Sequence, residues 1–158
     1  KMMDRLNPKK IVVVSSAPQI RYPDCYGIDM AKLEGLVAFR AALELLKERN
    51  LYHIVEEVYQ KSKAQEDFID ADVVNYVKEI YAPFTDQEIS DKIAEMLTPD
   101  NTKAEVKIIY QTVADLHIAC PKNLGDWYFT GDYPTDGGNR VVNRAFMNYY
   151  EGKDARAY

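Results

Sequence analysis

The stretch IVVVSS (11–16) decides the fold class of this chain of 158 residues. Four β-branched apolar residues follow one another without alternation, and two small polar residues close the run. Unbroken apolarity over this length is typical of a strand that is covered on both faces, as in a parallel sheet. Proline cannot donate to a sheet ladder, so Pro18 ends the strand. The run therefore predicts an α/β protein.

The rest of that sheet is not evident in the sequence. VKIIY (106–110) predicts a second short strand, and two strands alone cannot cover both faces of IVVVSS. The run also follows an expected helix end, in which Met2, Met3 and Leu6 precede the stop signal Asn7-Pro8, as in the second half of a βαβ crossover. We therefore expect the chain to be the C-terminal part of a larger α/β protein. The alternative is that the run is buried inside a helical bundle.

Four amphipathic helices are expected between the two strands. Asp29 is the expected N-cap of the first helix, Asn50 marks its break from the second, and Pro83 ends the third. Thr85 and Glu88 form a T-x-x-E capping box before the fourth. The apolar stripes are Leu33, Val37, Ala41 and Leu45; Leu51, Ile54, Val55, Val58 and Tyr59; Val73, Val77, Ile80 and Tyr81; and Ile89, Ile93, Met96 and Leu97.

The C-terminal third combines turn residues with aromatic ones. Thr112 and Asp115 are expected to cap a short helix that Pro121 stops. The segment 125–138 predicts a structured loop or hairpin. A last helix is expected over 139–150, followed by a frayed tail to residue 158.

Composition excludes several classes of partner. The formal charge is −5 and the pI is near 5.1, which argues against a nucleic acid or an anionic membrane as partner. No apolar run approaches the ~20 residues of a membrane span, and the N-terminus has no hydrophobic signal region. Two cysteines are too few for a disulfide scaffold and suit a reducing cytoplasm, so we expect a cytoplasmic protein.

Few residues carry the usual signatures of chemistry. No G-x-G-x-x-G, P-loop, G-x-S-x-G, H-E-x-x-H or C-x-x-C motif occurs. His53 and Glu57 are interpreted as surface charge complementarity, and His117 as a packed or half-exposed side chain. Cys25 could act as a nucleophile with a histidine, but nothing fixes that geometry. FIDADVV (68–74) lacks the small residues of a phosphoribose loop, so Asp70 is expected to be a helix cap.

The step Ser15-Ser16-Ala17-Pro18 lies where a parallel strand is expected to end. Open α/β sheets bind ligands outside the carboxyl ends of their strands. The alternative is that the serines satisfy loose backbone groups at the strand end. The pattern alone does not separate these two roles.

The run VVSSAPQIRYPDCYGIDM (13–30) resembles one family, glutamine phosphoribosylpyrophosphate amidotransferase. In that family a strand ends in small residues and a proline, and an Ile-Arg/Lys-Phe/Tyr-Pro segment and a Tyr-Gly-Ile-Asp block then lead into a helix. VKIIYQTVADL (106–116) is similar to a later strand and helix of the family, and FTGDYPT (129–135) to its C-terminal turn. The helical stretch 50–103 has no counterpart that we can place.

The resemblance implies an α/β fold with a partial type I phosphoribosyltransferase-like parallel sheet of few strands. Residues 1–158 would be the C-terminal part of that domain, with 50–103 as a predominantly helical insertion and 125–158 as a C-terminal loop and helix. The parent enzyme would be a purine-biosynthetic glycosyltransferase that converts glutamine and phosphoribosylpyrophosphate to 5-phosphoribosylamine, glutamate and pyrophosphate, with magnesium. The glutaminase domain and the phosphoribose-binding loop lie outside this chain. We therefore expect no catalytic residue or metal ligand here, an inactive isolated fragment and a homo-oligomeric parent.

The resemblance also implies supporting roles for seven residues. Ser15, Ser16, Ala17 and Pro18 would flank the phosphoribosyl site. Tyr26 and Asp29 would lie near the mobile loop that closes over substrate. Leu36 would face the apolar passage for ammonia, or simply pack in a helix.

One branch of the family holds an iron–sulfur cluster, from which this chain departs. Asp24 follows Pro23 where that branch has a cysteine, and GDWY (125–128) contains none. Such a cluster needs four thiolates, so none is expected from this chain alone.

Two other classes of function remain open at this point. The amphipathic helices alone would suit a noncatalytic helical protein-interaction module. A small hydrolase using Ser15 or Ser16 would need His53 or His117 beside the serine.

Overall fold

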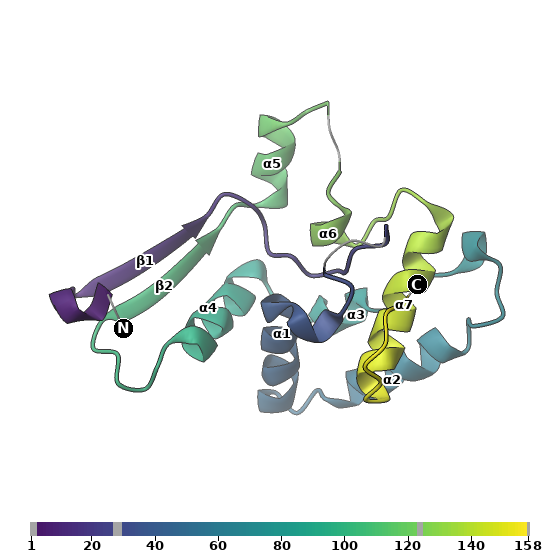
Figure 1. Ribbon diagram of the computed structural model, residues 1–158, viewed down its shortest axis with the longest axis horizontal. Coiled ribbons are helices and arrows are strands. Elements are labelled where there is room, and N and C mark those ends of the chain that lie inside the picture. Colours follow the sequence, from purple (N-terminus) through teal and green to yellow (C-terminus); the bar gives the residue numbers. More distant parts are fainter. Residues whose placement is uncertain (1–2, 27–29, 123–124, 158) are drawn as a thin grey trace.

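A two-stranded parallel sheet stands beside a helical body in the computed structural model, which describes residues 3–26, 30–122 and 125–157 (Figure 1). Strand β1 (Lys10–Ser15) pairs with β2 (Glu105–Tyr110) in an unbroken register from Lys10 opposite Glu105 to Ser15 opposite Tyr110. Both strands that the β-branched runs predicted are confirmed, as is the general α/β class. Nothing in this arrangement is specific to a phosphoribosyltransferase.

The sequence predicts a β1 strand that is buried on both faces, but the described residues leave its side chains largely exposed. Val14 is 70 % exposed, and Val12 and Val13 are about half exposed at 46 and 49 %. Helix α4 packs against β2, where Ile108 is buried, while β1 pairs only with β2 among the described residues. An apolar strand with one partner and an uncovered face is unusual, because parallel sheets are normally covered on both sides.

The helices form the core of the molecule. The largest buried side chains include Phe39 and Phe146, whose rings meet edge to face at 6.3 Å. In chain order, the helical elements are η1 (Met3–Leu6), η2 (Leu33–Gly35), α1 (Val37–Glu48), α2 (His53–Lys63), η3 (Asp70–Asp72), α3 (Lys78–Tyr81), α4 (Asp86–Leu97), α5 (Val113–Ala119), α6 (Trp127–Thr130) and α7 (Asp136–Tyr150), where η marks a 3-10 helix.

Local signals account for the helix ends that were predicted well. The Thr85 hydroxyl accepts from the Glu88 amide while the Glu88 carboxylate accepts from the Thr85 amide, which completes the predicted capping box of α4. Thr112 caps α5 through the Asp115 amide, also as predicted. Asn50 has a φ of 57° between α1 and α2, a left-handed conformation that asparagine tolerates and that ends a helix.

The third predicted helix is wrong in extent. Its apolar positions are largely buried, but only the single turn of α3 is helical. Asp70 is also not a cap, since it lies inside η3, where no side chain caps the first turn, and pairs with Arg140 of α7. The first helix likewise starts later than its stripe suggests, because η2 and an extended Leu36 precede α1.

The C-terminal predictions need three corrections. The segment 125–138 forms α6 and the start of α7 and contains no hairpin in its described part. Helix α7 begins at Asp136, before the expected residue 139. The tail is not frayed as far as residue 157, because Ala157 is buried and the Asn148 amide donates to the carbonyls of Ala155 and Arg156.

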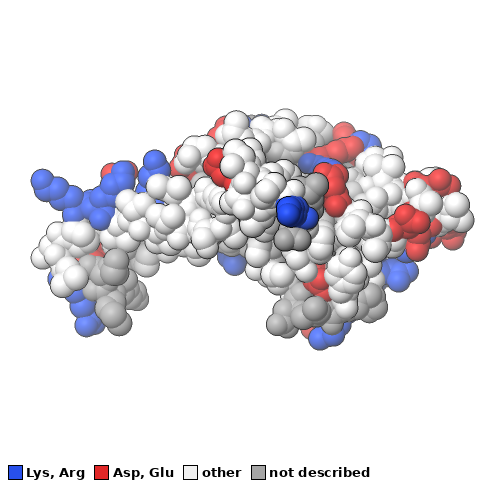
Figure 2. Space-filling view, turned by 90° about the horizontal axis from the view of Figure 1, so that it is seen from above, with Lys and Arg blue, Asp and Glu red and all other residues white. Residues whose placement is uncertain are grey.

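Charge is unevenly distributed along the molecule. On the face shown in Figure 2, Lys and Arg gather at the end where the strands begin, and Asp and Glu dominate the opposite end. Within the described ranges, no helix has the length and apolarity needed to cross a bilayer.

Candidate functional site

A pocket of about 250 Å³ opens where both parallel strands end. Figure 1 shows the two arrows pointing the same way, so the loops that leave β1 and β2 meet at this edge. This is the edge of an open α/β sheet at which ligands bind. The charged, amide and hydroxyl side chains from the two strand exits and from α4 that line the pocket are Gln19, Arg21, Asp86, Gln87, Ser90, Gln111 and Thr112.

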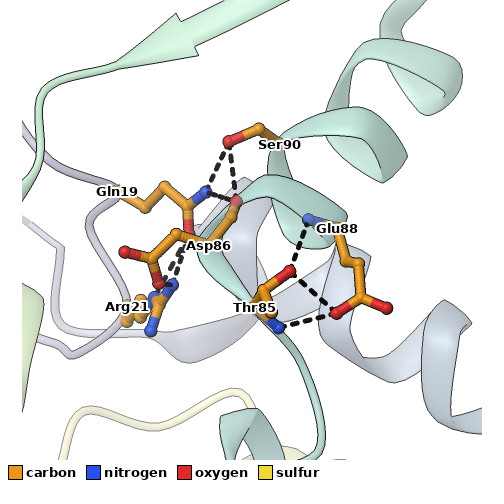
Figure 3. Close-up of polar contacts among 6 residues, drawn as sticks. All are labelled: Gln19, Arg21, Thr85, Asp86, Glu88 and Ser90. Atoms are coloured by element: carbon orange, nitrogen blue, oxygen red, sulfur yellow. Dashed lines mark hydrogen bonds and ion pairs between the residues drawn. The ribbon is translucent and has the colours of Figure 1, made fainter.

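Gln19 joins the exit of β1 to the first turn of α4 (Figure 3). Its side-chain amide donates to the Asp86 carbonyl and to the Ser90 hydroxyl, both at 2.7 Å. Its amide oxygen accepts from two nitrogens of the Arg21 guanidinium, at 3.2 and 2.7 Å. Because Gln19 is itself buried and bonded to α4, these bonds fix the position of the arginine.

Arg21 is the cationic group of the pocket. Its side chain is 17 % exposed, lies 5.3 Å over the ring of Tyr81 and pairs with the Asp86 carboxylate. Asp86 itself is 68 % exposed and could turn to solvent. A guanidinium held in this way offers paired N–H donors that match the oxygens of a phosphate or carboxylate. The arrangement can therefore bind an anionic ligand that displaces Asp86.

Two of the three segments that resemble the amidotransferase family, 13–30 and 129–135, lie side by side in the fold. The backbone amides of Arg21 and Tyr22 both donate to the Tyr128 carbonyl, at 2.8 and 3.1 Å. The Tyr128 hydroxyl donates to the buried Asp24 carboxylate at 2.8 Å. The Tyr133 hydroxyl donates to the Pro23 carbonyl at 2.5 Å. Residues more than 100 positions apart thus build one wall beside the pocket, to which Phe129 also contributes.

Burial is the main cause of the raised pKa values of the tyrosines in and beside this wall. Desolvation raises the pKa of Tyr22 and of Tyr133 far above the usual range, and it also raises the pKa of Tyr81. The Tyr128 pKa is raised by burial and by its hydrogen bond to Asp24. These hydroxyls are therefore neutral hydrogen-bond donors at any physiological pH.

Gly131 allows this wall to close. Its φ is +73°, and a Cβ at this position would lie 2.8 Å from the Tyr22 ring and 2.7 Å from the Asn75 side chain. Asn75 in turn donates to the Gly131 carbonyl at 3.1 Å. Only glycine meets both the conformational and the spatial demand here.

The four predicted strand-end residues have different surroundings. Pro18 lines the pocket. The Ser15 hydroxyl donates to the Ala17 carbonyl at 2.9 Å and accepts from the Ala17 amide at 3.3 Å, so Ser15 satisfies backbone groups at the strand end. Ser16 is exposed.

Of the residues predicted to support a loop or a channel, neither Tyr26 nor Leu36 lines the pocket. Tyr26 is 54 % exposed and meets the ring of Trp127 edge to face at 6.0 Å. Leu36 is buried in the apolar core just before α1. Asp29 lies outside the described residues, together with Gly27 and Ile28.

The histidines and cysteines form no nucleophile–base pair in the described part of the chain. His117 is bonded through Nε2 to Asp126 at 2.8 Å and its side chain is 39 % exposed, while His53 is exposed. Neither histidine is hydrogen-bonded to Ser15 or Ser16, so the small-hydrolase hypothesis has no geometric support. Burial and the neighbouring Asp24 raise the pKa of Cys25, which makes its thiol less reactive.

Magnesium, which the resemblance implies, has no evident protein site here. Among the described residues, no three His, Cys, Asp or Glu side chains come together as a metal site. Asp86 is the only carboxylate that lines the pocket in this part of the chain, and it pairs with Arg21. The described residues therefore do not fit a resident magnesium ion.

The sequence analysis missed the residues that shape the pocket. Gln19 and Arg21 stand there only within the run 13–30 that resembles the family, and Asp86 and Ser90 only within the fourth expected helix. The signal that could have found them is the presence of Gln19 and Arg21 between Pro18 and Pro23, just beyond the end of a predicted strand. Their contacts with α4 span about 65–71 residues and leave no local pattern.

Comparison with known proteins adds no relative. No family model matches the chain, and neither a curated protein nor a solved structure is significantly similar to it.

Proposed function

We propose that this chain is the C-terminal part of the phosphoribosyltransferase domain of an amidophosphoribosyltransferase. The parent reaction transfers ammonia from glutamine to the C1 carbon of phosphoribosylpyrophosphate and releases pyrophosphate. The observation that carries the proposal is the pocket at the carboxyl edge of the parallel strands. One side of it is formed by the segment Pro18–Arg21, which lies within the run that resembles this family.

Two further observations support a partial domain. The apolar faces of β1 are exposed, as they would be if more strands or helices of the same enzyme covered them. The segments 13–30 and 129–135, which carry separate parts of the resemblance, are joined by the hydrogen bond from Tyr133 to the Pro23 carbonyl, and Tyr128, just before the second segment, bonds to residues 21–24. Both observations suit a fragment better than a self-sufficient helical module.

In this proposal the chain binds and orients, and it supplies no reacting group. Arg21, positioned by Gln19, would contact a phosphate oxygen of the substrate, and Asp86 would release the guanidinium as the ligand enters. The Gln111 side chain would offer a neutral hydrogen bond from the exit of β2. Magnesium would be held by phosphate oxygens of the substrate and by residues of the parent beyond this chain.

The decisive experiment uses the complete reading frame that contains this sequence. We expect its upstream part to encode an acidic pair followed by Thr- and Ser-rich residues, and a cysteine-led glutaminase domain before it. The purified full-length protein should release pyrophosphate from phosphoribosylpyrophosphate with either glutamine or ammonium chloride as nitrogen donor. The isolated chain should not.

A matched pair of arginine variants tests the role of the pocket within that protein. Arg21→Met should raise the KM for phosphoribosylpyrophosphate by about tenfold or more, since a charge-assisted hydrogen bond contributes ~1.5–3 kcal/mol. Arg40→Met, on the exposed face of α1, should leave KM unchanged. An upstream sequence without the acidic pair, or a full-length protein that releases no pyrophosphate, would contradict the proposal.

A further inference from the structure

A small cavity between α2 and α7 holds two polar atoms that lack a partner. Ser62 Oγ and Asn143 Oδ1 are buried and have no hydrogen-bond partner among the described residues. Both residues line the same cavity, and their side chains are only 2 and 3 % exposed. Buried polar atoms are rarely left without a partner, because the lost hydration is not replaced, so two in a single cavity point to a ligand.

The orientation of Asn143 is fixed by its neighbours. Its amide nitrogen donates to the Val74 carbonyl at 2.8 Å, and a carbonyl oxygen can only accept. The amide therefore cannot turn over, and Oδ1 requires a hydrogen-bond donor. Ser62 Oγ can either donate or accept, so one small molecule could serve both atoms.

Size and charge select the ligand. The cavity has a volume of about 10 Å³, close to the ~10–15 Å³ that one water molecule requires. Arg140 and Arg144 line it together with a single carboxylate residue, Glu66, and this net positive set disfavours a cation. An anion could not donate to Asn143 Oδ1. We infer that a single integral water molecule bridges Ser62 Oγ and Asn143 Oδ1.

This water would complete a polar network around the segment 73–75. Gln65 exchanges two hydrogen bonds with the backbone of Val74, at 2.8 and 3.1 Å. Asn139 donates to the Val73 carbonyl at 2.8 Å. Side chains from the end of α2 and from α7 thus replace secondary structure in this segment. With the water in place, Ser62 joins the same network, and α2 is tied to α7 through it.

The cavity lies apart from the pocket at the strand ends, so the inference does not depend on the proposed function. The direct test is a crystal structure of the 158-residue chain at about 1.5 Å, from crystals grown without ammonium salts. We expect a density peak within hydrogen-bond distance, ~3.2 Å or less, of both oxygens. No peak there, with Ser62 Oγ donating instead to the Val58 carbonyl one turn earlier, would overturn the inference.

A mutant cycle provides a second readout in solution. Ser62→Ala and Asn143→Ala should each lower the thermal midpoint by about 3–6 °C. The double variant should lose clearly less than the sum, because both substitutions remove the same bridging water. Ser16→Ala, at an exposed serine, should leave the midpoint unchanged. If the fall in thermal midpoint of the double variant equals the sum of the two single falls, the inferred water bridge is wrong.

Discussion

Replacing Gln19 by methionine should destabilise the protein by about 3 kcal/mol, although methionine keeps most of the volume of the side chain. The wild-type amide makes four hydrogen bonds, two as donor to α4 and two as acceptor from Arg21. Ser90 retains its own bond to the Asp86 carbonyl at 2.8 Å, so that carbonyl is not left unpaired. Most of the loss therefore comes from the bonds to the guanidinium.

The magnitude follows from the kind of bond that is removed. A neutral hydrogen bond contributes ~0.5–1.5 kcal/mol net and a charged one ~1.5–3 kcal/mol, and bonds that share one amide do not add in full. A loss of about 3 kcal/mol corresponds to a fall of roughly 6–12 °C in the thermal midpoint for a domain of this size.

Equilibrium unfolding in urea, followed by circular dichroism, measures the effect. Gln87→Met is the matched control, because Gln87 is an exposed glutamine of α4 whose side chain, among the described residues, bonds to Asp91 alone. Its cost should stay below about 0.5 kcal/mol. If Gln19→Met were as mild as this control, Gln19 would not be the side chain that joins the strand exit to α4, and Arg21 would need another support.

Three further perturbations test other parts of the structure. Gly131→Ala should lower the free energy of unfolding by more than about 2 kcal/mol, because strain at φ +73° adds to a clash with the Tyr22 ring. Gly152→Ala, at φ +66° in open space, should lower it by only about 1 kcal/mol. Equal losses for the two variants in urea unfolding would contradict the close approach at Gly131. The hydrogen bond from Arg49 and those from Thr85 lower the Glu88 pKa from 4.5 to about 2. The stability that Glu88 contributes is therefore complete above pH 4.5 and is lost as the pH falls towards 2. Between these pH values the free energy of unfolding should fall less steeply for Glu88→Gln than for wild type. Identical slopes for the two proteins would contradict this role of Glu88. Val14→Lys should reduce the concentration-dependent self-association measured by sedimentation velocity, because Val14 is 70 % exposed on a strand whose other edge has no partner among the described residues. The thermal midpoint should stay within about 2 °C of wild type. A wild-type chain that sediments as a monomer at every concentration would refute the reasoning.

Local patterns predicted the elements whose signals are local. The β-branched runs fixed both strands, and the T-x-x-E box placed the start of α4 correctly. Each of these depends on residues within one turn or one strand. Such signals act before any tertiary contact forms, which is why sequence alone was sufficient.

The third helix shows where the periodic pattern misleads. Val73 and Val77 are buried at helical spacing, yet the backbone between them is not helical. Its hydrogen bonds go instead to the side-chain amides of Gln65 and Asn143, and the Asn75 side chain accepts from the Val77 amide at 3.1 Å. Side chains supply these partners, and Gln65 and Asn143 lie 9 and 69 positions from Val74, so burial could be predicted here and backbone conformation could not.

The pocket was predictable only as a location. Pro18, at the expected strand end, lines the pocket, because parallel strands share their carboxyl edge, and a binding role for this strand end stays a prediction. Gln19 and Arg21, which provide the polar groups of the pocket, are positioned by contacts with α4, a helix far from them in the sequence. A pattern within the loop carries no trace of such partners.

The parallel pairing of β1 with β2 has a kinetic consequence. Roughly 90 residues separate the two strands, and every bond between them must wait for that loop to close. Helices α1 and α2 are near neighbours in sequence and can form and pack without this closure. The sheet should accordingly be the last part of the described molecule to assemble and the first to open, so amides of β1 would exchange with solvent deuterium well before those of the helical core.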